Sequence, residues 1–121
     1  MATPDIIDVA TINGVMIAGA VTTSATDVID VAADKTYKIN TVIISNIHGT
    51  NDATVSAKVS ADNGSNYYHI AKTVTVPADS SVHLITKDSS IYLDETDLLN
   101  LVASANSALE YVISYETLDD A

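Results

Sequence analysis

The sequence predicts an all-β protein, an antiparallel β-sandwich of the jelly-roll or immunoglobulin-like type, with about eight strands and an extended N-terminal arm. Two observations support this prediction. Hydrophobic residues make up 47% of the 121 residues, and they are mostly Val, Ile and Ala, while Phe and Trp are absent. β-Branched side chains favour pleated surfaces over helices. Polar turn residues also recur at short intervals along the chain, as they do between the strands of a sandwich.

The clearest strand pattern lies in residues 37–60. In its second half, Val55, Ala57 and Val59 alternate with polar side chains, which is the period of a strand with one buried face. The first half contains Val42-Ile43-Ile44, a run that predicts a strand covered on both faces. Residues 48–52 contain the Gly, Asn and Asp typical of turns, so we expect a central hairpin here.

The rest of the chain also consists of predicted strands separated by turn residues. Asn63-Gly64 is a strong hairpin signal. We expect further strands at residues 15–23, 26–32, 66–76, 82–87, 91–93, 98–105 and 109–116. We expect three parts: an extended arm over 1–14, a sandwich domain over 15–117 and an acidic tail over 118–121.

The arm contains four large aliphatic residues, Ile6, Ile7, Val9 and Ile12. We expect these side chains to bind a partner surface, either the sheet of the same chain or a neighbouring subunit. The alternative is a frayed terminus, which is common at chain ends.

The charge balance narrows the choice of partners. The chain has 5 Lys+Arg against 16 Asp+Glu, a formal net charge of −11, and every basic residue is a lysine. Nucleic acids and anionic membranes are therefore not expected partners, because both attract positive charge. The apolar run at residues 15–21 is too short to span a bilayer. Cysteine is absent and no signal peptide is recognisable, so we expect synthesis in a cytoplasm.

No pattern predicts an active site, so we expect no enzymatic activity, no catalytic residues, no metal and no cofactor. Two metal alternatives remain open. His69 and His83 could meet across neighbouring strands, and carboxylates at 94–97 or at 27–34 could hold calcium. The simpler interpretation is a solvated charged corner. Tyr67 and Tyr68 are adjacent and point to opposite sides of a strand, so at most one lies in the core and the other is a possible surface contact.

The ordered set of segments at residues 37–46, 53–56, 74–79, 91–95 and 109–116 resembles the small β-sandwich virion proteins of tailed bacteriophages, over about residues 20–117. The resemblance implies a non-enzymatic structural protein, with a capsid decoration or cement protein as the first choice. It also implies a homo-oligomer, with a trimer favoured, that binds the major capsid protein or other virion subunits. The protein would be made in the host cytoplasm and located in the virion. A tail, neck or baseplate location and a host-glycan-binding module remain alternatives.

Overall fold

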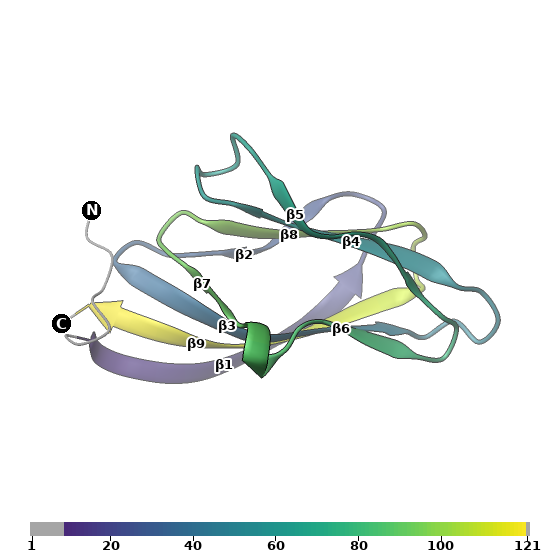
Figure 1. Ribbon diagram of the computed structural model, residues 1–121, viewed down its shortest axis with the longest axis horizontal. Coiled ribbons are helices and arrows are strands. Elements are labelled where there is room, and N and C mark those ends of the chain that lie inside the picture. The colour runs from purple at the N-terminus through teal and green to yellow at the C-terminus, as the bar shows by residue number, and fades with distance from the viewer. Residues whose placement is uncertain (1–8, 121) are drawn as a thin grey trace.

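The computed structural model describes residues 9–120, with side chains for residues 12–86 and 88–118. This part of the chain forms nine β-strands and one short 3-10 helix, and the strands make two antiparallel sheets that face each other (Figure 1). The predicted all-β sandwich is therefore confirmed. Among the described residues, no helix is long and apolar enough to cross a bilayer.

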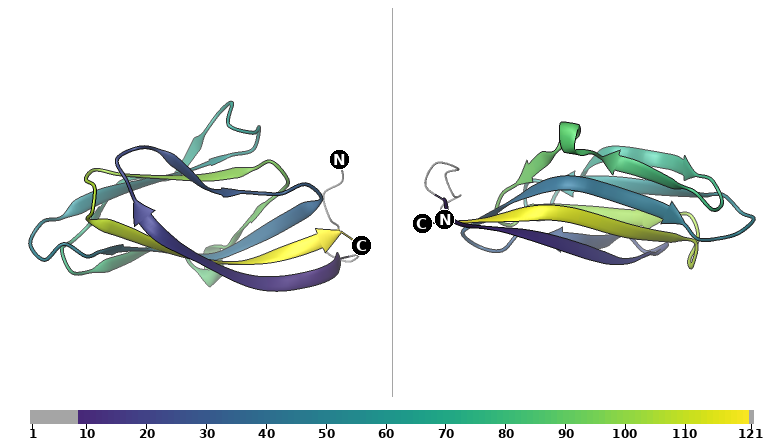
Figure 2. Two further views of the ribbon diagram at one scale, coloured as in Figure 1. Left: turned by 180° about the vertical axis from the view of Figure 1, so that it is seen from behind. Right: turned by 90° about the horizontal axis from the view of Figure 1, so that it is seen from below.

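The two sheets have different sizes. The five-stranded sheet has the order β1-β9-β3-β6, with β7 also paired to β3, and Figure 2 shows β1, β9 and β3 side by side. The four-stranded sheet has the order β2-β8-β4-β5. The strands are β1 (Val9–Val21), β2 (Thr26–Asp30), β3 (Lys35–Asn46), β4 (Ala53–Ser60), β5 (Tyr68–Val76), β6 (Ser81–Ile85), β7 (Ile91–Leu93), β8 (Leu98–Ala103) and β9 (Leu109–Asp120), with the helix η2 (Lys87–Ser89) between β6 and β7.

The strand order is that of a jelly roll. The first strand pairs with the last, β2 pairs with β8, β3 pairs with β6 and β7, and β4 pairs with β5, all antiparallel. The chain is thus one long hairpin folded back on itself and rolled into two sheets. Two further pairings, of β3 with β9 and of β4 with β8, complete the two sheets. Of the two sandwich types that the sequence allows, this is the jelly roll.

The predicted central hairpin is wrong, although both of its strands exist. β3 belongs to the five-stranded sheet and β4 to the four-stranded sheet, so residues 47–52 cross between the layers. The side chains that give each strand its alternation face each other across the core instead of lying side by side. The outer side of β3 is also more open than predicted, since Ile43 is only half-buried. A strand with one buried face looks the same in sequence whether its neighbour lies beside it or opposite it.

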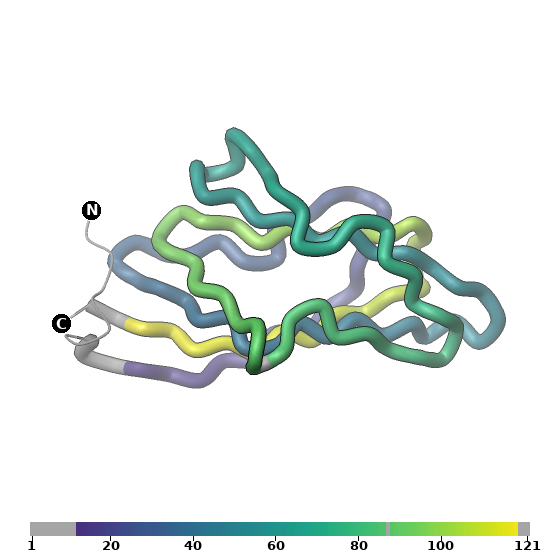
Figure 3. Tube along the Cα trace, in the orientation of Figure 1, coloured from purple at the N-terminus to yellow at the C-terminus, as the bar shows by residue number. Residues whose placement is uncertain are grey.

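The hairpin predicted at Asn63-Gly64 is confirmed. β4 and β5 pair within one sheet, and the loop of residues 61–67 projects from it (Figures 1 and 3). Asn63 and Gly64 have φ values of 58° and 91°, and the N–H of Ser65 donates to the carbonyl of Asp62 at 3.4 Å. Two positive φ values in succession are what the turn of an Asn-Gly hairpin requires.

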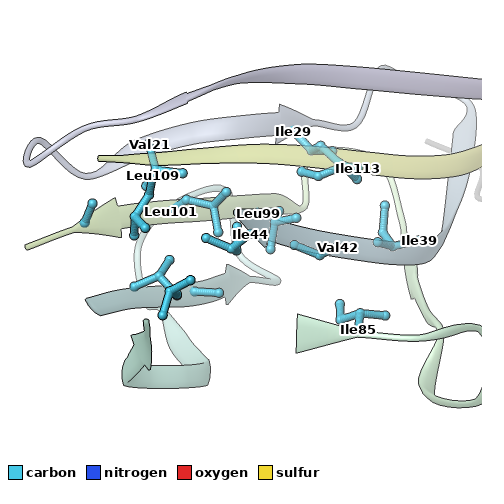
Figure 4. Packing of buried hydrophobic residues seen from close by; sticks show 14 of the residues in the cluster. Val21, Ile29, Ile39, Val42, Ile44, Ile85, Leu99, Leu101, Leu109 and Ile113 are labelled. Atoms are coloured by element: carbon cyan, nitrogen blue, oxygen red, sulfur yellow. The ribbon is translucent and has the colours of Figure 1, made fainter. Parts of the chain in front are cut away.

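The core lies between the sheets and is made almost entirely of aliphatic side chains (Figure 4). The alternation is clearest in β4, where Ala53, Val55 and Ala57 are buried and the residues between them are only half-buried, as the pleat requires. Burial of each large aliphatic side chain stabilises the fold by about 1.5–3 kcal/mol. The most completely buried hydrophobic residues are Val31, Ile39, Val42, Ile44, Val55, Val76, Leu99, Leu101, Leu109 and Ile113.

The two predicted domain boundaries do not separate structural units. β1 runs from Val9 through residue 14 without a break, so residues 9–14 belong to the sheet and are no separate arm. Likewise β9 continues to Asp120, and Leu118, expected in an acidic tail, is only 6% exposed. The reason is that β1 and β9 pair along their whole length, with Ile12 opposite Leu118, so each end orders the other.

Candidate interaction surface

The outer side of the five-stranded sheet exposes apolar side chains near its β1 edge. In β1 the even-numbered residues point away from the core, and Ile12 and Met16 are 59% and 63% exposed. On the neighbouring β9, Val112 is 37% exposed. We call this surface the apolar face, and it consists of Ile12, Met16, Ala18, Ala20, Ile43 and Val112.

Cross-strand register makes the apolar face continuous over three strands. Ala18 lies opposite Val112, which in turn lies opposite Ile43. Two carboxylates adjoin it: Glu110 is opposite Ala20 at one end, and Glu116 is opposite Gly14, between Ile12 and Met16. The section from Met16 to Ala18, with Val112 and Ile43, is uncharged on a chain of net charge −11, a feature typical of contact sites.

A depression of about 310 Å³ lies where β1 runs beside β9. The residues of β1 here are small, and Gly19 is opposite Tyr111, whose ring occupies the space that a side chain at position 19 would need. A Cβ atom at position 19 would lie 2.9 Å from Tyr111 Oη and 3.0 Å from Cε2. The lining residues are Ala18, Gly19, Ala20, Glu110, Tyr111 and Val112.

The four aliphatic residues predicted to bind a partner have different outcomes. Ile6 and Ile7 lie outside the described residues. Val9 is the first residue of β1, and its side chain is not described. Ile12 lies in the apolar face. Of the predicted contact set, Ile12 therefore belongs to a larger apolar surface, whose other members were not predicted.

Neither of the two adjacent tyrosines belongs to the core. Tyr67 packs on the outer side of the four-stranded sheet, where its hydroxyl donates to Asp27 Oδ1 at 2.9 Å. Lys58 Nζ lies 5.4 Å from the centre of its ring. The hydrogen bond to the Asp27 carboxylate raises the pKa of Tyr67. Tyr68 is 70% exposed at the start of the edge strand β5, so it is the tyrosine that is free to contact a partner.

Asn100 contacts the same Asp27 carboxylate as Tyr67, and its side chain is buried, with 5% of the residue exposed. Its Nδ2 donates to the same Asp27 oxygen at 2.9 Å, while its Oδ1 is buried and has no hydrogen-bond partner among the described residues. In the neighbouring loop, Asn66 lowers the pKa of Asp62 by donating from its side-chain amide and its backbone N–H, and the Ser60 hydroxyl adds a third donor. These carboxylates thus organise the 61–67 loop and its contact with the sheet.

The carboxylates at residues 94–97 serve as acceptors for backbone N–H groups. Asp97 Oδ2 accepts from Asp94 N at 2.8 Å, and Glu95 Oε2 accepts from Asp34 N at 2.9 Å. Partial burial raises the pKa of Asp97, and the nearby Asp94 charge raises it further. Within the described residues, no group of three or more His, Asp or Glu side chains is placed to hold a metal ion.

His69 and His83 do not lie on neighbouring strands of one sheet. His69 lies in β5 of the four-stranded sheet, and His83 lies in β6 of the five-stranded sheet. His48 is a turn residue, as predicted, because its Nδ1 accepts from the backbone N–H groups of Thr50 at 3.2 Å and Asn51 at 3.1 Å.

No protein-family model and no curated protein matches this sequence. Among solved structures, the chain is similar to one of the Bacillus endospore appendages, which form disulfide-linked pili. That similarity has a TM-score of 0.51 at 14% identity and covers 91% of this chain and 87% of the other. At this identity it shows the fold alone.

Two further solved structures resemble the chain at lower scores. The Drosophila NLP core, a pentamer, has a TM-score of 0.48 at 13% identity, covering 84% of this chain and 96% of the other. A chain of infectious bursal disease virus has a TM-score of 0.47 at 7% identity, covering 92% of this chain and 33% of the other.

Proposed function

We propose that this chain is a non-enzymatic structural protein of a tailed-bacteriophage virion, and that it decorates or cements the head. The observation that carries the proposal is the apolar face, whose section around Met16, Val112 and Ile43 carries no charge on a protein whose net charge is −11. The apolar face would lie on a capsid subunit, while the acidic remainder faces solvent and limits non-specific aggregation.

The fold is compatible with this role. A jelly roll with an aliphatic core gives a rigid body, and a chain of similar fold occurs in a Bacillus pilus. The 121 residues contain no cysteine, so the contacts proposed for this chain are non-covalent.

The N-terminal residues would add to the contact. Ile6 and Ile7 precede the strand that carries Ile12, so all three could reach the same partner subunit. Burial of each aliphatic side chain would add about 1.5–3 kcal/mol to binding before the cost of ordering the chain is subtracted.

Quantitative mass spectrometry of purified virions tests the location. A copy number comparable with that of the major capsid protein would support the head, whereas a few copies per particle would support the tail, neck or baseplate. Absence of the chain from virions would contradict the proposal.

A binding assay on particles that lack this protein tests the surface. We expect Met16→Asp/Val112→Asp, or deletion of residues 1–8, to weaken attachment at least about tenfold, since each removes apolar contact. Deletion of 1–14 is unsuitable because it would remove half of β1. Thr73→Asp/Thr75→Asp is the matched control, because it adds the same charge at exposed positions of β5, in the other sheet. Wild-type attachment of both test variants would contradict the proposed surface.

Glycan binding is a second candidate, favoured by the 70% exposure of Tyr68 beside the 61–67 loop. Exposed tyrosine rings are suited to contacts with partly apolar ligands. A glycan array with the wild-type chain, Tyr68→Ala and the control Tyr92→Ala distinguishes the two functions. Selective sugar binding that only Tyr68→Ala abolishes would support a glycan-binding module over a decoration protein.

A further inference from the structure

β1 is a long sheet edge without the usual protection against pairing. It has 13 residues and none of them is Asp, Glu, Lys, Arg, His or Pro. Its partner on one side is β9, and the register between them is unbroken from Thr11 to Val21. Among the described strands none pairs with the other side of β1, which is the end of the sheet in Figure 2. Exposed main-chain groups in such a strand are a ready template for another strand.

The other edges of the two sheets are protected. β2 has five residues, including Asp27 and Asp30, and its register with β8 is interrupted. β5 contains Lys72, has two irregularities against β4 and places Thr73 at a φ of 47°. β6 and β7 have five and three residues. Charges, bulges and shortness are the usual means of blocking edge pairing, and β1 has none of them between Thr11 and Val21.

We propose that two copies of this chain pair along the free edges of their β1 strands, antiparallel, about a two-fold axis at Val15. The distribution of charge indicates that the strand which pairs with β1 belongs to a second copy of this chain. Two bodies of net charge −11 repel each other least where neither carries carboxylates, and β1 is the uncharged edge. A basic partner would instead be attracted to edges such as β2, which has two aspartates.

The side chains of β1 suit this register. With the axis at Val15, Gly14 of one copy lies opposite Met16 of the other, and Ile12 lies opposite Ala18. Each large side chain on the outer side thus meets a small one, which is favourable for cross-strand packing. Symmetry makes the contact isologous, the commonest arrangement in oligomers.

The proposed pairing rests on the proposed function and adds an oligomeric state to it. An axis perpendicular to the sheet keeps both apolar faces on one side, so the dimer would present a joined apolar surface of twice the area to the particle. The inference is tested on the purified chain alone. A monomeric result would overturn it and leave attachment to virions to be judged by its own experiment.

Sedimentation velocity over a concentration series is the first test. We expect the wild type to form dimers and Met16→Asp/Ala18→Asp to dimerise at least about tenfold more weakly, because four carboxylates would surround the axis. The matched control is Thr73→Asp/Thr75→Asp, which adds the same charge at exposed positions of the β5 edge. Circular dichroism checks that each variant is folded. A wild-type monomer at about 100 µM, a trimer, or equal dimerisation of both variants would overturn the proposal.

Disulfide trapping is the second test, and it is unambiguous because the chain has no cysteine of its own. Val15→Cys places two thiols beside the axis, within reach of each other, and should give covalent dimers on mild oxidation. Ala20→Cys is the control, since antiparallel pairing about Val15 separates the two thiols by roughly 33 Å at about 3.3 Å per residue. Cross-linking at Ala20, or at neither position, would overturn the pairing.

Discussion

At the residue scale, Asn46 fixes the crossing between the two sheets. It is 3% exposed at the end of β3. Its Nδ2 donates to the carbonyls of Asn51 at 3.0 Å and Val76 at 2.9 Å, and its Oδ1 accepts from His48 N at 2.8 Å. A buried amide with all these partners is stabilising, because otherwise two carbonyls and one N–H would be left unpaired.

We therefore expect Asn46→Leu to lower the free energy of unfolding by about 3 kcal/mol, since one buried and two partly buried polar groups lose their partner. Urea denaturation measures the change. Asn51→Ala is the control, because Asn51 takes part through its backbone carbonyl, and it should change stability by less than about 0.5 kcal/mol. Equal effects of the two substitutions would contradict this role of the Asn46 side chain.

Asp97, in contrast to Asn46, is a hydrogen-bond acceptor whose negative charge destabilises the folded state. Partial burial, and then the Asp94 charge, raise its pKa in the folded state. Because the folded-state pKa lies above the unfolded-state value, the ionised carboxylate weakens the fold at neutral pH. That penalty decreases as the pH falls through the raised pKa, and it is gone below the unfolded-state pKa.

Asp97→Asn keeps an oxygen acceptor for Asp94 N and removes the charge, so it should raise stability at pH 7. The gain over the wild type should vanish below about pH 3, where the wild-type side chain is protonated. Urea titrations at both pH values measure it. Asp97→Ala lacks the acceptor and should destabilise the fold at both. A gain for the Asp97→Asn variant that persists at low pH would exclude the titration of Asp97 as its cause.

At the scale of the strand, two glycines in β1 have different surroundings. A Cβ atom at Gly19 would meet Tyr111 at 2.9 Å, whereas a Cβ atom at Gly14 would have no atom within 4 Å. The β1–β9 contact is therefore close-packed at one end and open at the other. Overpacking is destabilising in the first case, while loss of backbone freedom in the unfolded chain is stabilising in the second.

Gly19→Ala should accordingly lower the free energy of unfolding by about 1–3 kcal/mol, because Tyr111 must move. Gly14→Ala is the matched control and should leave stability unchanged or raise it by up to about 1 kcal/mol. Thermal or urea unfolding distinguishes them. Equal effects of the two substitutions would show that the Tyr111 contact does not limit residue 19.

At the scale of the whole molecule, the dominant feature is the imbalance of 16 acidic against 5 basic residues. Carboxylates that surround one compact body repel each other, and the repulsion is relieved when the chain expands. Salt shortens the range of this repulsion, so it should stabilise the folded state.

We expect the urea midpoint to rise when NaCl increases from about 0.05 M to about 0.5 M, over which the Debye length falls several-fold. CaCl₂ at matched ionic strength is the control. An equal rise of the urea midpoint in both salts would support general screening. A much larger rise in CaCl₂ would support a calcium site with oxygen ligands, the alternative that the carboxylates at 94–97 and 27–34 left open.

The apolar face could be predicted from the sequence only in part. Ile12 was among the predicted contacts, but Met16, Ala18, Ile43 and Val112 were not, because β1 is apolar on both faces and alternation does not say which face is outside. One signal was available. Residues 9–21 contain no charge in a strongly acidic chain, and an uncharged strand that ends as a sheet edge is a candidate contact.

The sequence by itself determined that this chain is a β-sandwich, where most strands lie, and which residues of each strand share a face, since these follow from local side-chain period and turn chemistry. The tertiary structure decided which strands are neighbours. Alternation is the same for a strand paired beside its successor and for one facing it across a core. Long-range pairing of β1 with β9 therefore places residues 9–14 and 117–120 in the sheet. The pairings of β3 with β9 and of β4 with β8 put β3 and β4 in different layers, and β1 is an edge of its sheet.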